Sequence, residues 1–250
     1  MGKGHKRKQE GGEGGGGGGG GGEPAETPDD PPAVHAAAAG SVVAVACCTW
    51  LGAWDSSLRS AVALEGGGSP HEGAVLALAA SEEAGSGAVL LATAGDDKRL
   101  KLWRLAGGEA KLAWSLGTAK KLRCAAFARG GAHLFVADRL GDIYAVPCAP
   151  PAGGDAPAAS LVAGHWGTIV TALAVTPCGG LLLSTDRDAK VRATEVPPEP
   201  SAPGAPYEVA SFCLGHDQYV CACAAGAAGG PGAWTGGGEG VLRAWDPRTG

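Results

Sequence analysis

The sequence lacks the features that mark membrane, secreted and zinc-binding proteins. No apolar stretch reaches the ~18 residues that a membrane-spanning helix needs. The basic N-terminal stretch Lys3–Lys8 is followed by glycines instead of an apolar segment, so it is no secretory signal. The eight cysteines form no CxxC pair, the usual signature of a zinc site. We therefore expect no membrane contact, and cysteines that serve as small buried hydrophobic residues in a reducing compartment.

Signatures of catalysis are missing as well. The sequence contains no HExxH, no P-loop and no strand–GxGxxG–helix unit. The glycine tract Gly11–Gly22 has neither the preceding strand nor the lysine that phosphate binding needs. The segment Asp186-Arg187-Asp188 offers only two carboxylates, which indicates a strand turn instead of a metal site. We expect no catalytic residue, no metal ligand and no bound cofactor in this chain.

A basic excess is also absent, since the net charge is −5. A protein that binds nucleic acid mainly by itself is usually basic, so we expect any such contact to be shared with a partner. Glycine and proline are abundant, at 45 and 17 of 250 residues, which disfavours a helical bundle. Residues 1–33 combine the basic cluster, the glycine tract and a proline-rich segment, a composition typical of disorder. Residues 34–250 are long and apolar enough for one sizeable core.

From Ser41 onward the chain is a series of short β-like runs separated by Gly, Pro and Asp. These runs are Ser41–Cys47, Ala74–Ala80, Val89–Thr93, Leu100–Leu105, Lys121–Phe127, His133–Val136, Asp142–Val146, Ile169–Val175, Leu181–Ser184, Lys190–Thr194 and Glu208–Leu214. Short strands at regular spacing indicate a sandwich, a barrel or a propeller. Four strand ends, at Trp103, Val146, Thr194 and Trp245, follow one another at intervals of 43, 48 and 51 residues. This spacing is close to the ~40–45 residues of a propeller blade, so we predict an all-β propeller with four to five blades.

Three of the four repeats also carry the same polar residues. A histidine is followed by a hydroxyl, a carboxylate and then Trp or Thr. The sets are His71, Thr93, Asp97 and Trp103; His165, Ser184, Asp188 and Thr194; and His216, Thr235, Glu239 and Trp245. A hydrolase triad would not recur three times, so we predict a structural network that pairs buried polar groups within each blade. The other repeat has Thr118, Val136, Leu140 and Val146 in these places and has lost the network.

These motifs resemble the WD-repeat family of β-propellers. The family signature is Gly-His near the start of a repeat and Trp-Asp at its end. Gly164-His165, Gly215-His216 and Trp245-Asp246 fit this signature. The resemblance supports the propeller over the sandwich and the barrel.

Three segments, Phe135–Tyr144, Ser184–Arg192 and Ser211–His216, resemble one subfamily in particular. It is the non-catalytic WD-repeat subunit of the tRNA guanine-N7 methyltransferase, and the likeness covers roughly residues 90–250. The resemblance implies a scaffold that binds and stabilises a separate catalytic subunit as a heterodimer. S-adenosylmethionine is then expected on that subunit only, and tRNA is bound through the complex. The basic cluster Lys3–Lys8 is the feature from which we expect a nuclear location. Because the family builds a seven-bladed ring, the four to five blades here are expected to form an incomplete ring.

The resemblance also implies a partner-binding surface. It places Asp188, Lys190 and Arg192 at the interface with the catalytic subunit, and Arg187 lies beside them in the same turn. The family usually has an acidic residue where Ala189 stands, so one charge of this surface is missing. A solvated strand face is the alternative interpretation of these charges. The alternative function is a generic WD-repeat adaptor of a ubiquitin-ligase or chromatin complex, since one fold serves many partners.

Overall fold

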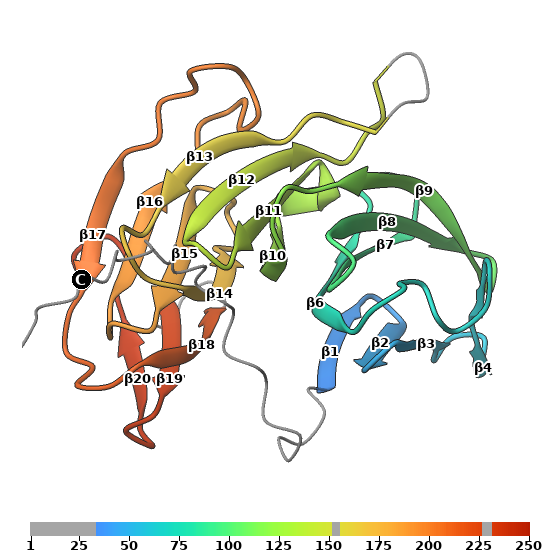
Figure 1. The fold of residues 1–250 in the computed structure, drawn as a ribbon, viewed down its shortest axis with the longest axis horizontal. Helices are drawn as coiled ribbons and strands as arrows, with labels where there is room; N and C mark the ends of the chain where they lie inside the picture. Colours follow the sequence, from blue (N-terminus) through green and yellow to red (C-terminus); the bar gives the residue numbers. More distant parts are fainter. Residues whose placement is uncertain (1–33, 152–155, 227–231) are drawn as a thin grey trace, which may run out of the picture. The chain divides into compact units, whose positions relative to one another are not determined.

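The computed structural model describes residues 34–151, 156–226 and 232–250, all of which belong to the unit Pro32–Gly250. The described residues contain β-strands and turns, one 3-10 turn at Arg129–Gly131, and no α-helix (Figure 1). Within the described residues, no helix is able to span a membrane. The disorder expected for residues 1–33, including the basic cluster, lies outside the described residues, and the domain division at residue 33 stays a prediction.

The strands form five sheets that follow one another along the chain. The first sheet contains β1 (Val34–Ala39), β2 (Val42–Cys47), β3 (Trp50–Asp55) and β4 (Ser60–Ala61). The second contains β6 (Val75–Glu82), β7 (Val89–Gly95), β8 (Arg99–Ala106) and β9 (Glu109–Gly117), with β5 (Ala63–Leu64) parallel to β9 at its edge. The third contains β10 (Leu122–Phe127), β11 (His133–Asp138), β12 (Asp142–Pro147) and β13 (Ser160–Gly164). The fourth contains β14 (Val170–Val175), β15 (Leu181–Asp186), β16 (Val191–Glu195) and β17 (Val209–Cys213), and the fifth contains β18 (Val220–Ala225), β19 (Ala233–Gly237) and β20 (Leu242–Trp245).

The sheets are arranged as the blades of a propeller. The first strand of each blade packs against the first strand of the next, in the order β1, β6, β10, β14 and β18 (Figure 1). Each later strand pairs antiparallel with the one before it and lies one place further out. The predicted all-β propeller is therefore confirmed, with five blades, which we number one to five in chain order.

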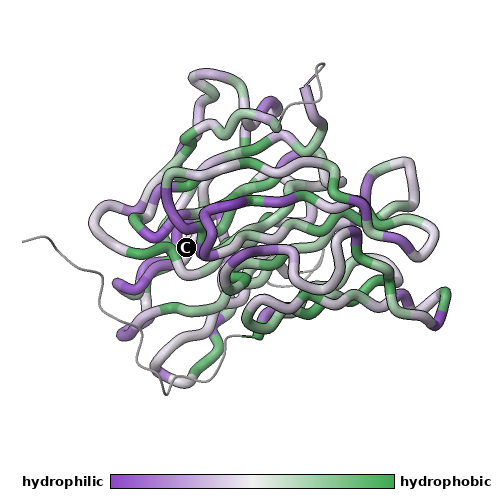
Figure 2. Tube along the Cα trace, turned by 45° about the vertical axis from the view of Figure 1, so that its right-hand side comes forward, coloured by the Kyte–Doolittle hydropathy of each residue, from purple (hydrophilic) through white to green (hydrophobic). Residues whose placement is uncertain are grey.

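The middle strands form the core of each blade because they are covered on both faces. Every residue of β7 and of β15 is buried, including the polar residues Ser184, Thr185 and Asp186 at the end of β15. The edge strand β17 has only one buried residue. Hydrophobic segments accordingly run along the strands, and most hydrophilic segments lie in the turns that join them (Figure 2).

The same irregularity recurs at the start of four inner strands. The pairing register of β6, β10, β14 and β18 shifts by one residue near the first pair, as in a β-bulge. The bulged residues are Leu76, Arg123, Thr171 and Cys221. Since bulges re-aim the strand locally, this repetition shows that blades two to five are built from one structural repeat.

All eleven predicted runs lie on strands of the structure. The inner strands β1 and β18 were not predicted, because their sequences VHAAAA and VCACAA are rich in alanine, which has a low strand propensity. They form strands because each pairs along its length with the second strand of its blade, and because β1 packs against β6 and β18 against β14. The seven-bladed ring stays a prediction.

Candidate functional site

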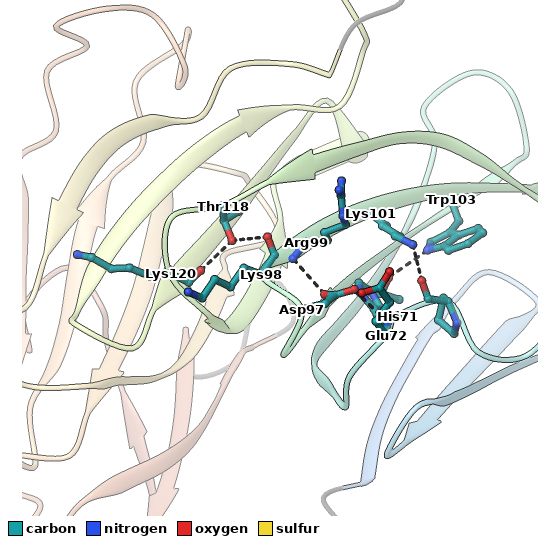
Figure 3. Close-up of polar contacts among 11 residues, drawn as sticks. His71, Glu72, Asp97, Lys98, Arg99, Lys101, Trp103, Thr118 and Lys120 are labelled. Carbon is teal, nitrogen blue, oxygen red and sulfur yellow. Dashed lines mark hydrogen bonds and ion pairs between the residues drawn. The ribbon is translucent and has the colours of Figure 1, made fainter. Parts of the chain in front are cut away.

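The second blade contains the polar network in full (Figure 3). His71 Nδ1 lies 3.0 Å from Asp97 Oδ1, and His71 Nε2 lies 2.9 Å from Thr93 Oγ1. Trp103 Nε1 donates to the same hydroxyl at 3.1 Å. Burial lowers the pKa of His71, although the bond to Asp97 opposes this shift. The neutral imidazole therefore donates from Nδ1 to Asp97 and accepts the Thr93 proton at Nε2.

The fifth blade repeats this arrangement with a glutamate. His216 donates to Glu239, and Thr235 Oγ1 lies 2.7 Å from His216 Nε2. Trp245 Nε1 donates to Thr235 at 2.7 Å. Arg243 adds two bonds to Glu239, of 3.0 and 3.2 Å, and these bonds are the main cause that lowers the pKa of Glu239 to about 2. The carboxylate is thus ionised under all ordinary conditions.

In the fourth blade the predicted carboxylate was wrong. The acceptor of His165 Nδ1 is Asp186 at 2.8 Å, not Asp188, which is exposed. Ser184 Oγ lies 2.7 Å from His165 Nε2, as the spacing predicted. Asp186 also accepts the backbone N–H groups of Asp188 and Lys190, both at 2.9 Å. One buried carboxylate therefore closes the turn and orients the histidine.

The residue at the end of the middle strand explains the difference between the blades. Glycine stands two residues after the hydroxyl in the second and fifth blades, at Gly95 and Gly237. A Cβ atom at Gly95 would lie 2.4 Å from His71 Nδ1 and 2.6 Å from Asp97 Oδ1, so only glycine leaves room for a carboxylate from the turn. The fourth blade places Asp186 itself at this strand end. The sequence did carry a signal, because this strand-end position is glycine in the second and fifth blades and aspartate in the fourth. The number of residues between the histidine and the carboxylate nevertheless selected Asp188 instead of Asp186.

The sequence predicted that the third blade has lost the network, but the structure shows that it keeps one member. Asp138 stands at the same strand end as Asp186, and its Oδ1 accepts the backbone N–H groups of Leu140 and Asp142 at 2.8 and 3.1 Å. Leu140, predicted to occupy the carboxylate position, is exposed. The Thr118 hydroxyl is 3.0 Å from the carbonyl of Lys98 in the second blade instead of binding a network member (Figure 3).

The predicted partner-binding residues divide into two groups. Arg187, Asp188 and Lys190 are exposed in the turn between β15 and β16. The turn needs a left-handed residue, and Ala189 takes it with φ 62°, as Lys98 does with φ 58° in the second blade. These three charged side chains are available to a partner.

Arg192 is held within the fourth blade. It is half-buried, its Nη1 donates to the carbonyl of Gly164 at 2.7 Å, and its guanidinium lies 5.4 Å from the centre of the Phe212 ring. Burial lowers its pKa, and its Nε has no hydrogen-bond partner. Lys101, which occupies the same register position in the second blade, likewise donates to the carbonyl before the network histidine, that of Pro70. Arg192 therefore anchors the loop that carries His165, a role the sequence did not indicate.

Sequence reasoning also missed an apolar part of this surface. Trp166, which follows His165 in the loop, is 99% exposed, and Leu140 is 55% exposed. The backbone N–H of His165 donates to Gly141 at 2.9 Å, which joins this loop to the turn of Leu140. The Arg187 N–H donates to Ile169 at 3.2 Å, which joins the same loop to the charged turn. We call Leu140, Trp166, Arg187, Asp188 and Lys190 the blade-four rim.

The described residues contain no group of three His, Cys, Asp or Glu side chains placed to hold a metal ion. The network histidines have their imidazole nitrogens bonded to carboxylates and hydroxyls inside the blades. In this arrangement the histidines provide hydrogen-bond partners for polar groups that are buried inside the blades.

Residues 157–193 match the family model of the WD domain, G-beta repeat. This match starts before β13, the last strand of the third blade, and ends in β16, so the sequence repeat is displaced from the blade by one strand. The strand β13 ends at Gly164, and the network histidine His165 follows it directly. The chain is a β-propeller in which residues 157–193 match a WD repeat.

Known proteins of two kinds resemble this chain. The tRNA (guanine-N(7)-)-methyltransferase non-catalytic subunit of Dictyostelium discoideum is 29% identical over 184 residues, covering 68% of this chain and 36% of the relative. The subunit of the same name from Homo sapiens is 31% identical over 178 residues, covering 66% of this chain and 39% of the relative. The chain thus spans under two fifths of these relatives. The solved β-propeller domain of Myceliophteria thermophila Cps50 (Swd1) superposes with a TM-score of 0.58 at 14% identity, over 78% of this chain and 58% of that one, and supports the fold.

The resemblance to non-catalytic subunits of the tRNA guanine-N7 methyltransferase, predicted from three segments, is confirmed by these relatives. Their names describe them as non-catalytic, in agreement with the expectation of a chain without its own active site.

Proposed function

We propose that this chain is a non-catalytic scaffold subunit that binds and stabilises the catalytic subunit of a tRNA guanine-N7 methyltransferase. The observation that carries the proposal is its similarity, at about 30% identity over two thirds of its length, to proteins named as that subunit. In this proposal the partner holds S-adenosylmethionine, tRNA is bound through the heterodimer, and the complex works in the nucleus. The net charge of −5 supports a shared nucleic-acid contact, because the partner can supply the basic surface.

The blade-four rim is the surface that we propose for the catalytic subunit. It combines an exposed tryptophan, a residue type that is enriched in protein interfaces, with charged side chains that suit the polar rim of an interface. Trp166 is the proposed anchor, since a tryptophan that becomes fully buried on binding often contributes most of the affinity. Lys190 and Asp188 are proposed to pair with charges of the partner around it. Arg192 supports this surface from below by holding the His165 loop.

Co-purification with a catalytic subunit tests the proposal, and charge reversal at Lys190 tests the surface. Lys190→Glu is expected to weaken the complex by about 30-fold or more, because an interface charge pair that loses one partner costs about 2–5 kcal/mol. Arg99→Glu is the matched control, since Arg99 is an exposed cation at the equivalent turn position of the second blade. Its affinity is expected to stay within about twofold.

The alternative function has its own outcome in the same experiment. Recovery of a ubiquitin ligase or a chromatin complex with the full chain, and no methyltransferase, would replace the scaffold proposal by the adaptor. Equal weakening by Lys190→Glu and Arg99→Glu would keep the partner and move the interface away from the blade-four rim. Trp166→Ala then provides an independent test, with an expected loss of at least tenfold in affinity.

A further inference from the structure

A cavity of about 230 Å³ lies between the second and third blades, and we call it the blade-three cavity. Its walls are apolar, with Leu100 from β8, Leu122 from β10, and Val136 and Val146 from the third blade. One buried carboxylate, Asp138, is part of the lining. Gly117, Ala119 and Ala159 at its border are exposed, so the cavity opens to solvent.

The residues around this cavity stand where the other blades carry their network. Val136 pairs with β12 as Thr93, Ser184 and Thr235 pair with their neighbouring strands. Val146 stands in the register position of Trp103 and Trp245. Thr118 lies in the loop that carries the histidine elsewhere, and it also lines the cavity. The cavity is thus the space that a hydroxyl, an imidazole and an indole fill in the second and fifth blades.

The carboxylate at the bottom of this space has one oxygen with weak partners. Asp138 and Asp186 use Oδ1 alike, each accepting two backbone N–H groups of its own turn. Asp186 Oδ2 then accepts His165 Nδ1 at 2.8 Å. Among the described residues, Asp138 Oδ2 has the Tyr144 hydroxyl at 3.3 Å and the Lys120 ammonium at 3.5 Å as its side-chain partners. Lys120 lies closer to Asp142, at 3.3 Å, so it can leave Asp138 without losing its ion pair.

We propose that the blade-three cavity binds a small planar azole, whose ring N–H donates to Asp138 Oδ2. The ring is recognised as the imidazole of His165 is recognised in the fourth blade, by a buried carboxylate at the end of a strand. The apolar walls bury the faces of the ring, and a cavity of about 150 Å³ is already large enough to hold benzene. The space of 230 Å³ therefore fits a fused bicyclic azole better than a single ring. The azole can be a free small molecule or the side chain of a histidine or tryptophan in another protein.

Benzimidazole is the probe, titrated against the full chain by calorimetry with the thermal midpoint as a second reading. The expected result is saturable binding and a rise in the midpoint. 1-Methylbenzimidazole, which keeps the fused ring system and carries a methyl group in place of the N–H hydrogen, is the control and is expected to bind at least tenfold more weakly, because a hydrogen bond to a charged group is lost. Peptides with a single His or Trp, tested in parallel, show whether the source of the ring is a free ligand or a side chain.

Two variants locate the binding. Val146→Trp fills the cavity and is expected to abolish benzimidazole binding, whereas Thr194→Val, at the same position of the fourth blade, leaves it unchanged. Should Val146→Trp fail to fold, the methylated probe on the unaltered chain still decides. No saturable binding of benzimidazole, equal binding of both probes, or undiminished binding to a folded Val146→Trp chain would each overturn the proposal.

Discussion

The third and fourth blades share one feature of their turns and differ in the side chains that lie beside it. Each has an aspartate at the end of its middle strand, Asp138 or Asp186, whose Oδ1 ties two backbone N–H groups of the turn. In the fourth blade His165 and Ser184 complete the network. In the third blade the corresponding space is a cavity of about 230 Å³. The comparison teaches that the carboxylate serves the turn first and the histidine second, so a blade can lose its imidazole and still fold.

Removing the shared carboxylate is the strongest way to test this comparison. Asp186→Ala is expected to lower the free energy of unfolding by about 3–5 kcal/mol, since His165 Nδ1 and two backbone N–H groups lose their acceptor together and each unpaired donor costs about 1–3 kcal/mol. Asp188→Ala, two residues further in the exposed part of the turn, is expected to change it by less than about 0.5 kcal/mol. Urea unfolding of both variants measures the difference. Equal losses in the free energy of unfolding would show that Asp188 belongs to the network, as predicted from the sequence.

Charge reversal on β16 separates support of the blade from contact with a partner. Arg192→Glu is expected to cost about 2 kcal/mol, because it removes the bond to the Gly164 carbonyl and places a half-buried carboxylate over Phe212. Lys190→Glu is expected to stay within about 0.5 kcal/mol, since Lys190 is exposed. Thermal unfolding of the isolated variants gives both values. A neutral Arg192→Glu would mean that Arg192, like Lys190, is free to serve only the interface.

Rebuilding the network in the third blade would sharpen the comparison from the other side. Thr118→His with Val136→Ser restores the histidine and hydroxyl beside Asp138. We expect a gain of about 1 kcal/mol in the free energy of unfolding, in the range of cavity-filling substitutions. Val136→Ser alone is the control and is expected to destabilise, because it leaves a hydroxyl without its imidazole. A double variant no more stable than this control would show that the imidazole cannot reach Asp138.

The smallest expected effect is on pH dependence, and the network contributes to it through His71 and His165. Burial lowers the pKa of His71 and His165 below the ordinary value of 6.5. The unfolded chain therefore binds more protons than the folded chain below about pH 6.5, and stability falls as the pH drops through that window. His165→Gln is expected to reduce the slope of thermal midpoint against pH, and Thr118→Ala in the third blade to leave it unchanged. An unaltered slope in His165→Gln would mean that His165 is not buried as the neutral form.

Much of the fold was accessible from periodicity. Strand ends at Trp103, Val146, Thr194 and Trp245 fixed the blade spacing, and the hydroxyl and aromatic members of the second and fifth networks followed from it. Alanine-rich β1 and β18 were missed because strand propensity does not register that each pairs with the second strand of its blade. Trp166 carried no repeat signal, and only its exposure singles it out.

The sequence by itself determined the class, the blade spacing and which residue types would recur, because these depend on order along the chain. Only the tertiary structure decided which carboxylate meets which imidazole. Asp186 and Asp188 differ by two residues in sequence, yet one is buried against His165 and the other faces solvent. The structure likewise assigned Arg192 to the Gly164 carbonyl and left a cavity beside Asp138. Such contacts depend on strand register and on the room that a glycine or an aspartate leaves at the strand end, which spacing along the chain does not contain.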